Sequence, residues 1–219
     1  IEDAEGIRAR LVSGANVLVI GAGWIGLEVA AAARKRDANA TVIELADRVC
    51  ARALTPEMSA WVHELHVSHG VEIRLSAAFD HFEGDGKLQR AVLGDGTAIP
   101  CDVAVVGIGL IPNTELAEQA GLSIDNGIVV DEHGQTSHPD IFSAGDVTNH
   151  PNALLGRRVR LESWENAQNQ GINAAKAMLG TMQPYAEIPW FWSDQYDANI
   201  QMMGLPENWD ETVIRGDRN

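Results

Sequence analysis

The sequence is poor in cysteine. Only Cys50 and Cys101 occur among its 219 residues, and they do not form a CxxC pair. Two thiols are too few for a disulfide framework, so the composition predicts a reducing, cytoplasmic setting. Neither cysteine lies in a motif that activates a thiolate, and we therefore expect two inert thiols instead of a redox pair.

Basic charge and long apolar runs are also scarce. The chain has 16 Lys and Arg residues against 31 Asp and Glu residues, a formal net charge of −15. Proteins that bind nucleic acid or anionic membranes need a basic face, so this charge disfavours both partners. No apolar run approaches the roughly 20 residues that span a bilayer. The balance of 45% hydrophobic and 21% charged residues is typical of a soluble globular protein.

Short apolar runs alternate with helical patterns through the first half of the chain. The runs at 16–20, 40–44, 71–75 and 103–106 predict buried parallel strands. Residues 78–102 contain short strands divided by glycine turns, which indicates an antiparallel meander. We therefore predict an α/β fold, Rossmann-like, with a parallel sheet plus an antiparallel meander.

The first predicted strand runs directly into the motif Gly21-Ala-Gly23-Trp-Ile-Gly26. In such a motif the first glycine permits a tight turn, the second lets the backbone approach a pyrophosphate, and the third lets the helix pack closely on the strand. The helix N-terminus then attracts the anion. A turn without a ligand is the alternative, and the strand–turn–helix–strand order argues against it.

Glu44 ends the second predicted strand, 23 positions after Gly21. A carboxylate there accepts a hydrogen bond from the ribose 2′-hydroxyl of NAD and repels the 2′-phosphate of NADP. A like-charge pair at about 4 Å costs about 4 kcal/mol at an effective dielectric near 20. Arg48 and Arg52 lie just downstream and could neutralise a phosphate. We predict that NAD is preferred over NADP.

Three histidines on one predicted helix suggest a metal site. His63 and His66 share a face, but His69 lies about 120° round the helix from His63. We therefore expect these histidines to occupy a solvated face and to bind no metal. The side chains expected to face the core are Trp61, Val62 and Leu65.

Five sequence blocks, in this order, resemble the ferredoxin reductases of the pyridine-nucleotide oxidoreductase superfamily. The last two are the narrower ones and indicate the NADH:ferredoxin reductase branch, to which the reductase components of aromatic-ring dioxygenases belong. The blocks are GAGWIGLEVAA (Gly21–Ala31), VVGIGLIPN (Val105–Asn113), TSHPDIFSAGD (Thr136–Asp146), RLESWENAQNQG (Arg160–Gly171) and IPWFWSDQ (Ile188–Gln195).

The resemblance implies a reaction and a set of site residues. NADH would pass hydride to FAD, and single electrons would go on to a [2Fe–2S] ferredoxin serving an oxygenase or a cytochrome P450. The cofactors carry the chemistry, so no catalytic side chain and no metal are expected. The residues implied to contact NADH are Gly21, Gly23 and Gly26 at the pyrophosphate, Trp24, Ile25 and Glu28 near the nicotinamide, Glu44 and Arg52 at the adenosine ribose, and Gly109. Those implied for FAD are Asp146 at the ribityl chain, Trp164 at the pyrimidine end and Trp190 by the ring, near the docked ferredoxin.

The resemblance also implies a domain order. Residues 1–113 would form the NAD(H)-binding domain, residues 114–183 the later part of an FAD-binding domain, and residues 184–219 the start of a C-terminal α+β interface domain. The superfamily's FAD domain begins with its own GxGxxG unit, which is not seen here, so we expect a fragment that binds NADH without retaining FAD. The alternatives are a relative of rubredoxin or nitrite reductases, or a nucleotide-binding module without turnover.

Arg157, Arg158 and Arg160 cluster just before the last predicted helix. Since oppositely charged surfaces speed protein association, we expect this cluster to contribute to a basic rim that steers an acidic ferredoxin.

Overall fold

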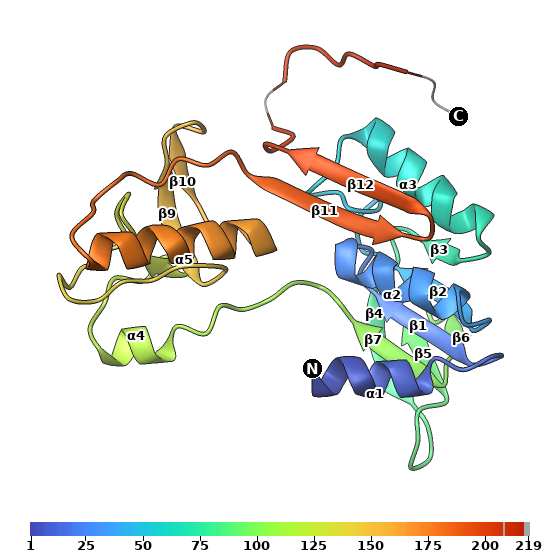
Figure 1. Cartoon of the computed structure of the whole chain (residues 1–219). Coiled ribbons are helices and arrows are strands. Elements are labelled where there is room, and N and C mark those ends of the chain that lie inside the picture. Colours follow the sequence, from blue (N-terminus) through green and yellow to red (C-terminus); the bar gives the residue numbers. More distant parts are fainter. Residues whose placement is uncertain (208, 217–219) are drawn as a thin grey trace. The chain divides into compact units, whose positions relative to one another are not determined.

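The computed structural model describes residues 1–207 and 209–216. It divides into two compact units, each treated by itself below. The first unit comprises Ile1–Gly109, Ser193–Ile200 and Pro206–Asn219, and the second comprises Leu110–Trp192 and Gln201–Leu205. Figure 1 labels the elements along the chain. In the described part of the chain, no helix combines the length and apolar character needed to cross a bilayer.

A four-stranded parallel sheet forms the centre of the first unit, in the order β3-β2-β1-β7. The central strand is apolar without alternation because both of its faces are covered, and Leu18 and Val19 are 0% exposed. The four predicted strands are confirmed with small shifts at their ends. They are β1 (Asn16–Ile20), β2 (Asn39–Ile43), β3 (Glu72–Arg74) and β7 (Val103–Val106).

Helices α2 (Trp24–Arg34) and α3 (Pro56–Ser68) pack against this sheet. The alanine-rich face of α2 is fully buried at Leu27 and Ala30. The start of α3 is defined by Thr55, whose side chain accepts a hydrogen bond from the Met58 N–H, and by Pro56, which needs no hydrogen-bond partner in a first turn. The helices of this unit are α1 (Glu2–Arg10), α2 (Trp24–Arg34) and α3 (Pro56–Ser68).

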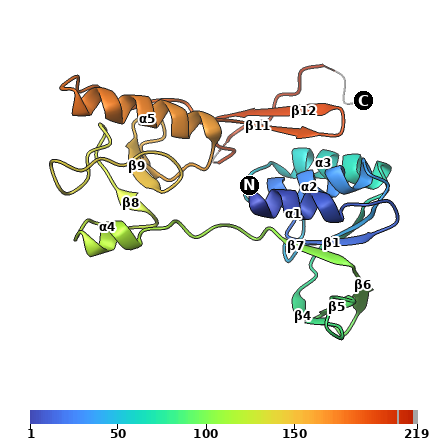
Figure 2. The ribbon, with the colours of Figure 1, turned by 60° about the horizontal axis from the view of Figure 1, so that its bottom comes forward.

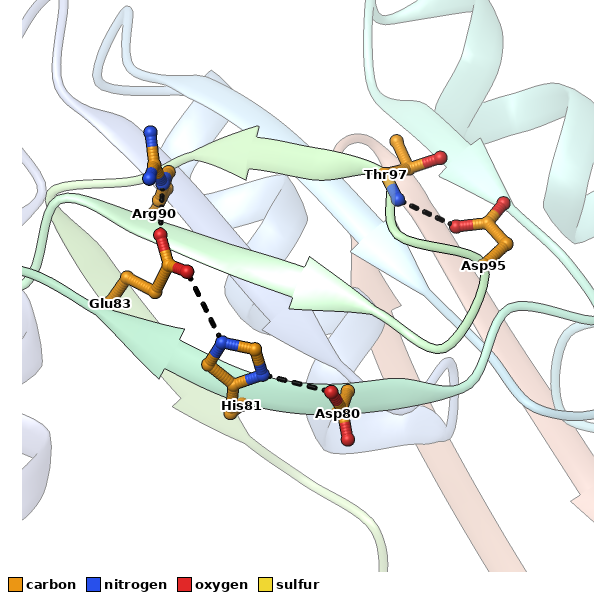
Figure 3. A network of polar contacts seen from close by, with 6 residues as sticks. All are labelled: Asp80, His81, Glu83, Arg90, Asp95 and Thr97. Atoms are coloured by element: carbon orange, nitrogen blue, oxygen red, sulfur yellow. Dashed lines mark hydrogen bonds and ion pairs between the residues drawn. The ribbon is translucent and has the colours of Figure 1, made fainter.

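The predicted meander is a three-stranded antiparallel sheet of β4 (Phe79–Glu83), β5 (Arg90–Leu93) and β6 (Ala98–Pro100). Its inner side chains, among them Leu93, join the core cluster that contains Leu18. Figure 3 shows the charged groups of the meander, where the His81 ring lies between the Asp80 carboxylate, 2.9 Å away, and the Glu83 carboxylate, 3.3 Å away. Arg90 also pairs with Glu83. The meander therefore covers the core with one face and carries ion pairs in solvent.

The second unit contains a small sheet in the order β10-β9-β8 and a long helix, α5. Figure 2 labels α5 together with β8 and β9. Ser163 caps α5, since its hydroxyl accepts a hydrogen bond from the Asn166 N–H at 3.3 Å. The elements are α4 (Glu115–Gln119), β8 (Ile128–Val129), β9 (Thr148–Asn152), β10 (Arg157–Val159) and α5 (Trp164–Met178).

A hairpin of β11 (Trp190–Gln195) and β12 (Ala198–Met203) follows, and its tip belongs to the first unit. The tip packs on α3, which corrects the prediction of a solvated histidine face. His66 is 0% exposed because the Gln195 side chain, 2.6 Å from its Nε2, covers it, whereas Trp61 is 40% exposed. The division into three domains stays a prediction.

Candidate functional site

Two of the three motif glycines are required by backbone contacts within the first unit. Gly21 has φ +101°, and a Cβ there would lie 2.5 Å from the Gly107 carbonyl oxygen. A Cβ on Gly26 would lie 2.1 Å from the Gly21 oxygen and 3.1 Å from a Val19 methyl carbon. Only glycine allows the tight turn after β1 and the close approach of α2 to it.

Gly23 is different, because a Cβ there would meet nothing within 4 Å. This residue is the N-cap of α2, in an extended conformation, and no side chain caps that helix. Packing within the chain therefore does not require glycine at position 23. A helix start of this kind, approachable along its backbone, fits an anionic group such as a pyrophosphate.

The glycine turn lies at the carboxyl ends of β1 and β7, where the order of the parallel sheet changes direction. The β2 and β3 strands continue the sheet on one side of β1, and β7 joins it on the other. Gly107, just after β7, donates its N–H to the Ile20 carbonyl at 2.8 Å. In open α/β sheets this switch point is where nucleotides bind.

Glu44 follows β2 and reaches back to the glycine turn. One carboxylate oxygen accepts the Ala22 N–H at 2.7 Å, and the other accepts the Ala46 N–H at 2.9 Å. An ionised carboxylate offers about four lone-pair positions, so two hydrogen bonds leave it able to accept from a ligand hydroxyl. Glu44 is half-buried, which fixes the carboxylate in place.

The two arginines after β2 have different surroundings. Arg48 donates to the Ala51 carbonyl at 2.7 Å and pairs with Asp47 at 3.9 Å. Arg52 is exposed, and its Nη2 lies 3.9 Å from the position that a Cβ on Gly109 would take. Arg52 is therefore the arginine that lies beside the loop after β7, while Arg48 binds its own loop.

The first turns of α2 carry the remaining residues expected at NADH. Ile25 is 69% exposed, and Trp24 is half-buried. Glu28 accepts a hydrogen bond from the Ser193 hydroxyl at 2.6 Å, a contact that the sequence did not reveal. The first unit thus holds nine of the predicted site residues, namely Gly21, Gly23, Trp24, Ile25, Gly26, Glu28, Glu44, Arg52 and Gly109.

Asp146 lies in the second unit, in the turn before β9, and is exposed. The turn is fixed by α5, because the Gly145 N–H donates to the Gln170 side-chain oxygen at 2.8 Å. Desolvation and the nearby Glu162 carboxylate raise the pKa of Asp146, and the charge of Arg160 opposes them. An exposed carboxylate on a fixed turn is suited to accept hydroxyl hydrogen bonds.

Three tryptophans of the second unit form a continuous aromatic cluster. Trp164, the first residue of α5, is 64% exposed, and its ring meets Trp192 edge to face at 6.2 Å. The Trp192 ring stacks on Trp190 at 5.1 Å. Trp164 and Trp190 were expected at the site and Trp192 was missed. The signal was present, since alternate residues of a strand share a face.

The arginines before α5 hold the second unit together. Arg158 donates to the Val130 carbonyl at 2.7 Å and to the Asn149 side chain at 3.0 Å. Arg160 pairs with Glu162 at 2.7 Å. These contacts give both guanidinium groups a structural role and weaken the expectation of a basic rim.

Both cysteines are free and buried. Burial, with a smaller contribution from the Glu44 charge, raises the pKa of Cys50 to about 12, and burial also raises the pKa of Cys101. These environments disfavour the reactive thiolate. Within residues 1–207 and 209–216, no three His, Cys, Asp or Glu side chains gather to hold a metal ion.

Comparison with known families matches most of the chain. Residues 1–171 match the family described as pyridine nucleotide-disulphide oxidoreductase. Residues 190–219 match a second family, described as reductase C-terminal.

Individual relatives agree with this match. The ferredoxin–NAD(+) reductase component of an anthranilate 1,2-dioxygenase system from Burkholderia cepacia is 49% identical over 99% of this chain and 53% of its own length. A ferredoxin reductase for the CYP199A2 system from Rhodopseudomonas palustris is 41% identical with a TM-score of 0.95, over 99% of this chain and 54% of its own. The reductase in a covalent putidaredoxin reductase–putidaredoxin complex is 44% identical with a TM-score of 0.94, over 99% and 53%.

The chain spans about half the length of the curated relatives it matches. Within that span the glycine turn, the acidic residue after β2 and the order of the parallel sheet all agree with the family match. This chain belongs to the pyridine nucleotide-disulphide oxidoreductase family.

Proposed function

We propose that this chain acts in a flavoprotein oxidoreductase that passes hydride from NADH to FAD and then single electrons to a [2Fe–2S] ferredoxin serving an oxygenase or a cytochrome P450. The proposal rests on one observation: Gly23 is at the N-terminus of α2, and the space that its side chain would fill is open. It stands at the switch point of the sheet with the Glu44 carboxylate beside it.

The residues of the first unit would bind and orient NADH. The backbone of Gly21, Gly23 and Gly26 would cradle the pyrophosphate at the start of α2. Glu44 would accept the 2′-hydroxyl of the adenosine ribose with its free lone pairs, and its charge would reject a 2′-phosphate. Arg52, beside Gly109, is the nearby positive group, and we expect NADH to remain the preferred nucleotide.

The residues of the second unit fit part of an FAD site. The exposed Asp146 carboxylate would accept hydroxyl groups of the ribityl chain, and its turn is fixed by Gln170. Trp164 and Trp190 would contact the ring, and Trp192 joins them into one apolar surface. When bound, FAD supplies the ability to take two electrons from NADH and release them one at a time.

The partner is proposed from the relatives. Two are named as ferredoxin reductases, and a third was solved in covalent complex with putidaredoxin. An iron–sulfur protein docking near Trp190 would suit this chemistry, since a two-electron donor must be matched to a one-electron acceptor. A cytoplasmic location is part of the proposal.

Turnover assays test the proposal. In a full-length flavoprotein that contains this chain and holds FAD, NADH oxidation is followed with cytochrome c as the final acceptor, with and without added ferredoxin. We expect ferredoxin to accelerate cytochrome c reduction. Acceleration by rubredoxin alone would favour the rubredoxin-reductase alternative, and NADH binding without turnover would favour the nucleotide-binding module. A chain that binds no NADH would contradict the proposal.

A further inference from the structure

A network of buried and partly buried hydrogen bonds leads to Glu28 within the first unit. The Ser193 hydroxyl lies 2.6 Å from Glu28 Oε1, and the Gln195 side-chain nitrogen lies 3.1 Å from the Ser193 hydroxyl. The Gln195 oxygen lies 2.6 Å from His66 Nε2, and the Tyr196 hydroxyl lies 3.2 Å from His66 Nδ1. The chain therefore links α3, the tip of the β11–β12 hairpin and α2.

The hydrogen bonds have one consistent direction. Since an ionised carboxylate can only accept, the Ser193 hydroxyl donates to Glu28 and accepts from the amide N–H of Gln195. The Gln195 oxygen must then accept from His66 Nε2–H. This leaves Nδ1 of a neutral imidazole as the acceptor for the Tyr196 hydroxyl. Each of the four hydrogen bonds thus has one donor and one acceptor.

The three central members of this network are deeply buried, while Glu28 and Tyr196 at its ends are half-buried. His66 and Gln195 are 0% exposed and Ser193 is 1% exposed. Burial lowers the pKa of His66, which keeps the ring in the neutral form that the chain of bonds requires. A fully satisfied polar network in a low-dielectric interior selects one arrangement of its side chains. Apolar side chains would suffice to pack the hairpin on α2 and α3, so packing alone does not account for Ser193, Gln195 and His66.

Glu28 lies in the second turn of α2. It follows the exposed Ile25 by three residues, and residues three apart on a helix are neighbours. A carboxylate fixed at this place can accept an N–H of a ligand that passes the start of α2. The nicotinamide half of NADH ends in a carboxamide with such a donor, and ADP-ribose lacks this group.

We propose that Ser193, held by Gln195 and His66, is a positioning residue that orients the Glu28 carboxylate toward the carboxamide of NADH. This inference rests on the proposed NADH-binding function. It assigns a role in nucleotide selectivity to a hairpin residue 165 positions away from Glu28.

Calorimetric titration of the full chain with NADH and with ADP-ribose tests the inference. For Ser193→Ala we expect the affinity for NADH to fall at least about tenfold, since a hydrogen bond to a charged group contributes a factor of roughly 10 to 150. The affinity for ADP-ribose should not change, which also shows that the variant is folded. Asp194→Asn is the matched control, because Asp194 is on the opposite, exposed face of β11 and should change neither affinity.

A double substitution separates positioning from general support. In a Glu28→Gln background, Ser193→Ala should cause little further loss of NADH affinity, because both changes act on the same contact. Equal losses for NADH and ADP-ribose, or no loss for either, would overturn the role of Ser193. If the unsubstituted chain binds neither ligand, the proposed function itself fails, and that result is distinct from the other two.

Discussion

The carboxylate of Glu44 accepts the backbone N–H of Ala22 at 2.7 Å, so the residue that follows β2 holds the turn that follows β1. Ala22 lies between the first two glycines of the motif. The same side chain also binds the Ala46 N–H at 2.9 Å. One carboxylate thus shapes the glycine turn, and in the proposed function it would also select the nucleotide.

The first prediction concerns this double role. We expect the protein to bind NADH at least about tenfold more tightly than NADPH, since a 2′-phosphate would approach the Glu44 charge. Glu44→Ala should narrow that difference. It should also lower the free energy of unfolding by about 1–3 kcal/mol, because two backbone N–H groups lose a partly buried acceptor. Calorimetry with both nucleotides and urea denaturation measure the two effects.

Asp47→Ala is the control for this prediction, because it removes an exposed acidic side chain from the same loop. It should leave both the nucleotide preference and the stability nearly unchanged. Equal affinities for NADH and NADPH in the unsubstituted protein would contradict the proposed role of Glu44.

The second prediction compares two glycines of one motif. Gly26→Ala should destabilise the fold by several kcal/mol, because its Cβ would lie 2.1 Å from the Gly21 oxygen and α2 would have to move. Gly23→Ala should destabilise the fold far less, since its Cβ meets no atom of the chain and only the preference for glycine over alanine at an N-cap is lost. It should still weaken NADH binding at least about tenfold if the pyrophosphate approaches this backbone.

Gly171→Ala, in the middle of α5, controls for the glycine-to-alanine change itself. Its Cβ also meets nothing within 4 Å, and it lies in the second unit, away from the glycine turn. It should raise stability by up to about 1 kcal/mol through helix propensity and leave NADH binding intact. Normal NADH binding by Gly23→Ala would place the pyrophosphate elsewhere.

The sequence predictions were accurate where the residues that contact one another are close together in the sequence. The strand–turn–helix–strand order around the glycine turn, with Glu44 just after the second strand, was predicted correctly because one short segment contains all of it. The binding roles of these residues stay predictions. His66 was assigned to a solvated face because its partner Gln195 is 129 positions away. Ser193 was missed for the same reason. The periodicity of a helix shows which residues share a face, but it does not show which later segment will cover that face.

The third prediction concerns pH. The pKa values of His66 and His150 are lowered mainly by desolvation, so the unfolded chain binds protons that the folded chain does not. Their contribution to stability is therefore present above the unfolded pKa of about 6.5 and is lost as the pH falls from there toward the folded values. The titratable groups near the His66 ring are Tyr196, His63 and His69. Urea denaturation at about pH 7.5 and about pH 5.5 measures the loss.

Substitutions at two histidines test the sign of this effect. His66→Gln removes a buried titrating group and should reduce the loss of stability at low pH. His81→Gln should make that loss slightly larger, because hydrogen bonds with Asp80 and Glu83 raise the pKa of His81 and stabilise the folded state below about 6.5. That contribution is small because His81 is in solvent. A pH dependence unaffected by His66→Gln would contradict the assignment.

The fourth prediction concerns the thiols. Burial raises the pKa of Cys50 to about 12 and also raises that of Cys101. Because the thiolate is the nucleophile, neither cysteine should react rapidly with an aromatic disulfide reagent at about pH 8 in the folded protein. Both should react in concentrated urea. Rapid reaction of one thiol before unfolding would show that its surroundings open readily.

The position of β7 in the sheet has a consequence for the order of folding. β7 pairs with β1, although α2, β2, α3, β3 and the meander lie between the two strands in the sequence. Beside this pair, the Asn16 N–H binds the Asp102 carboxylate at a separation of 86 positions. Closing so long a loop is slow, whereas β1, α2 and β2 can associate as soon as they leave the ribosome. Gly107 reaches the glycine turn only after β7 has docked. Docking of β7 therefore completes the glycine turn at the proposed nucleotide site, and NADH should bind the finished domain and slow its opening without guiding the early stages.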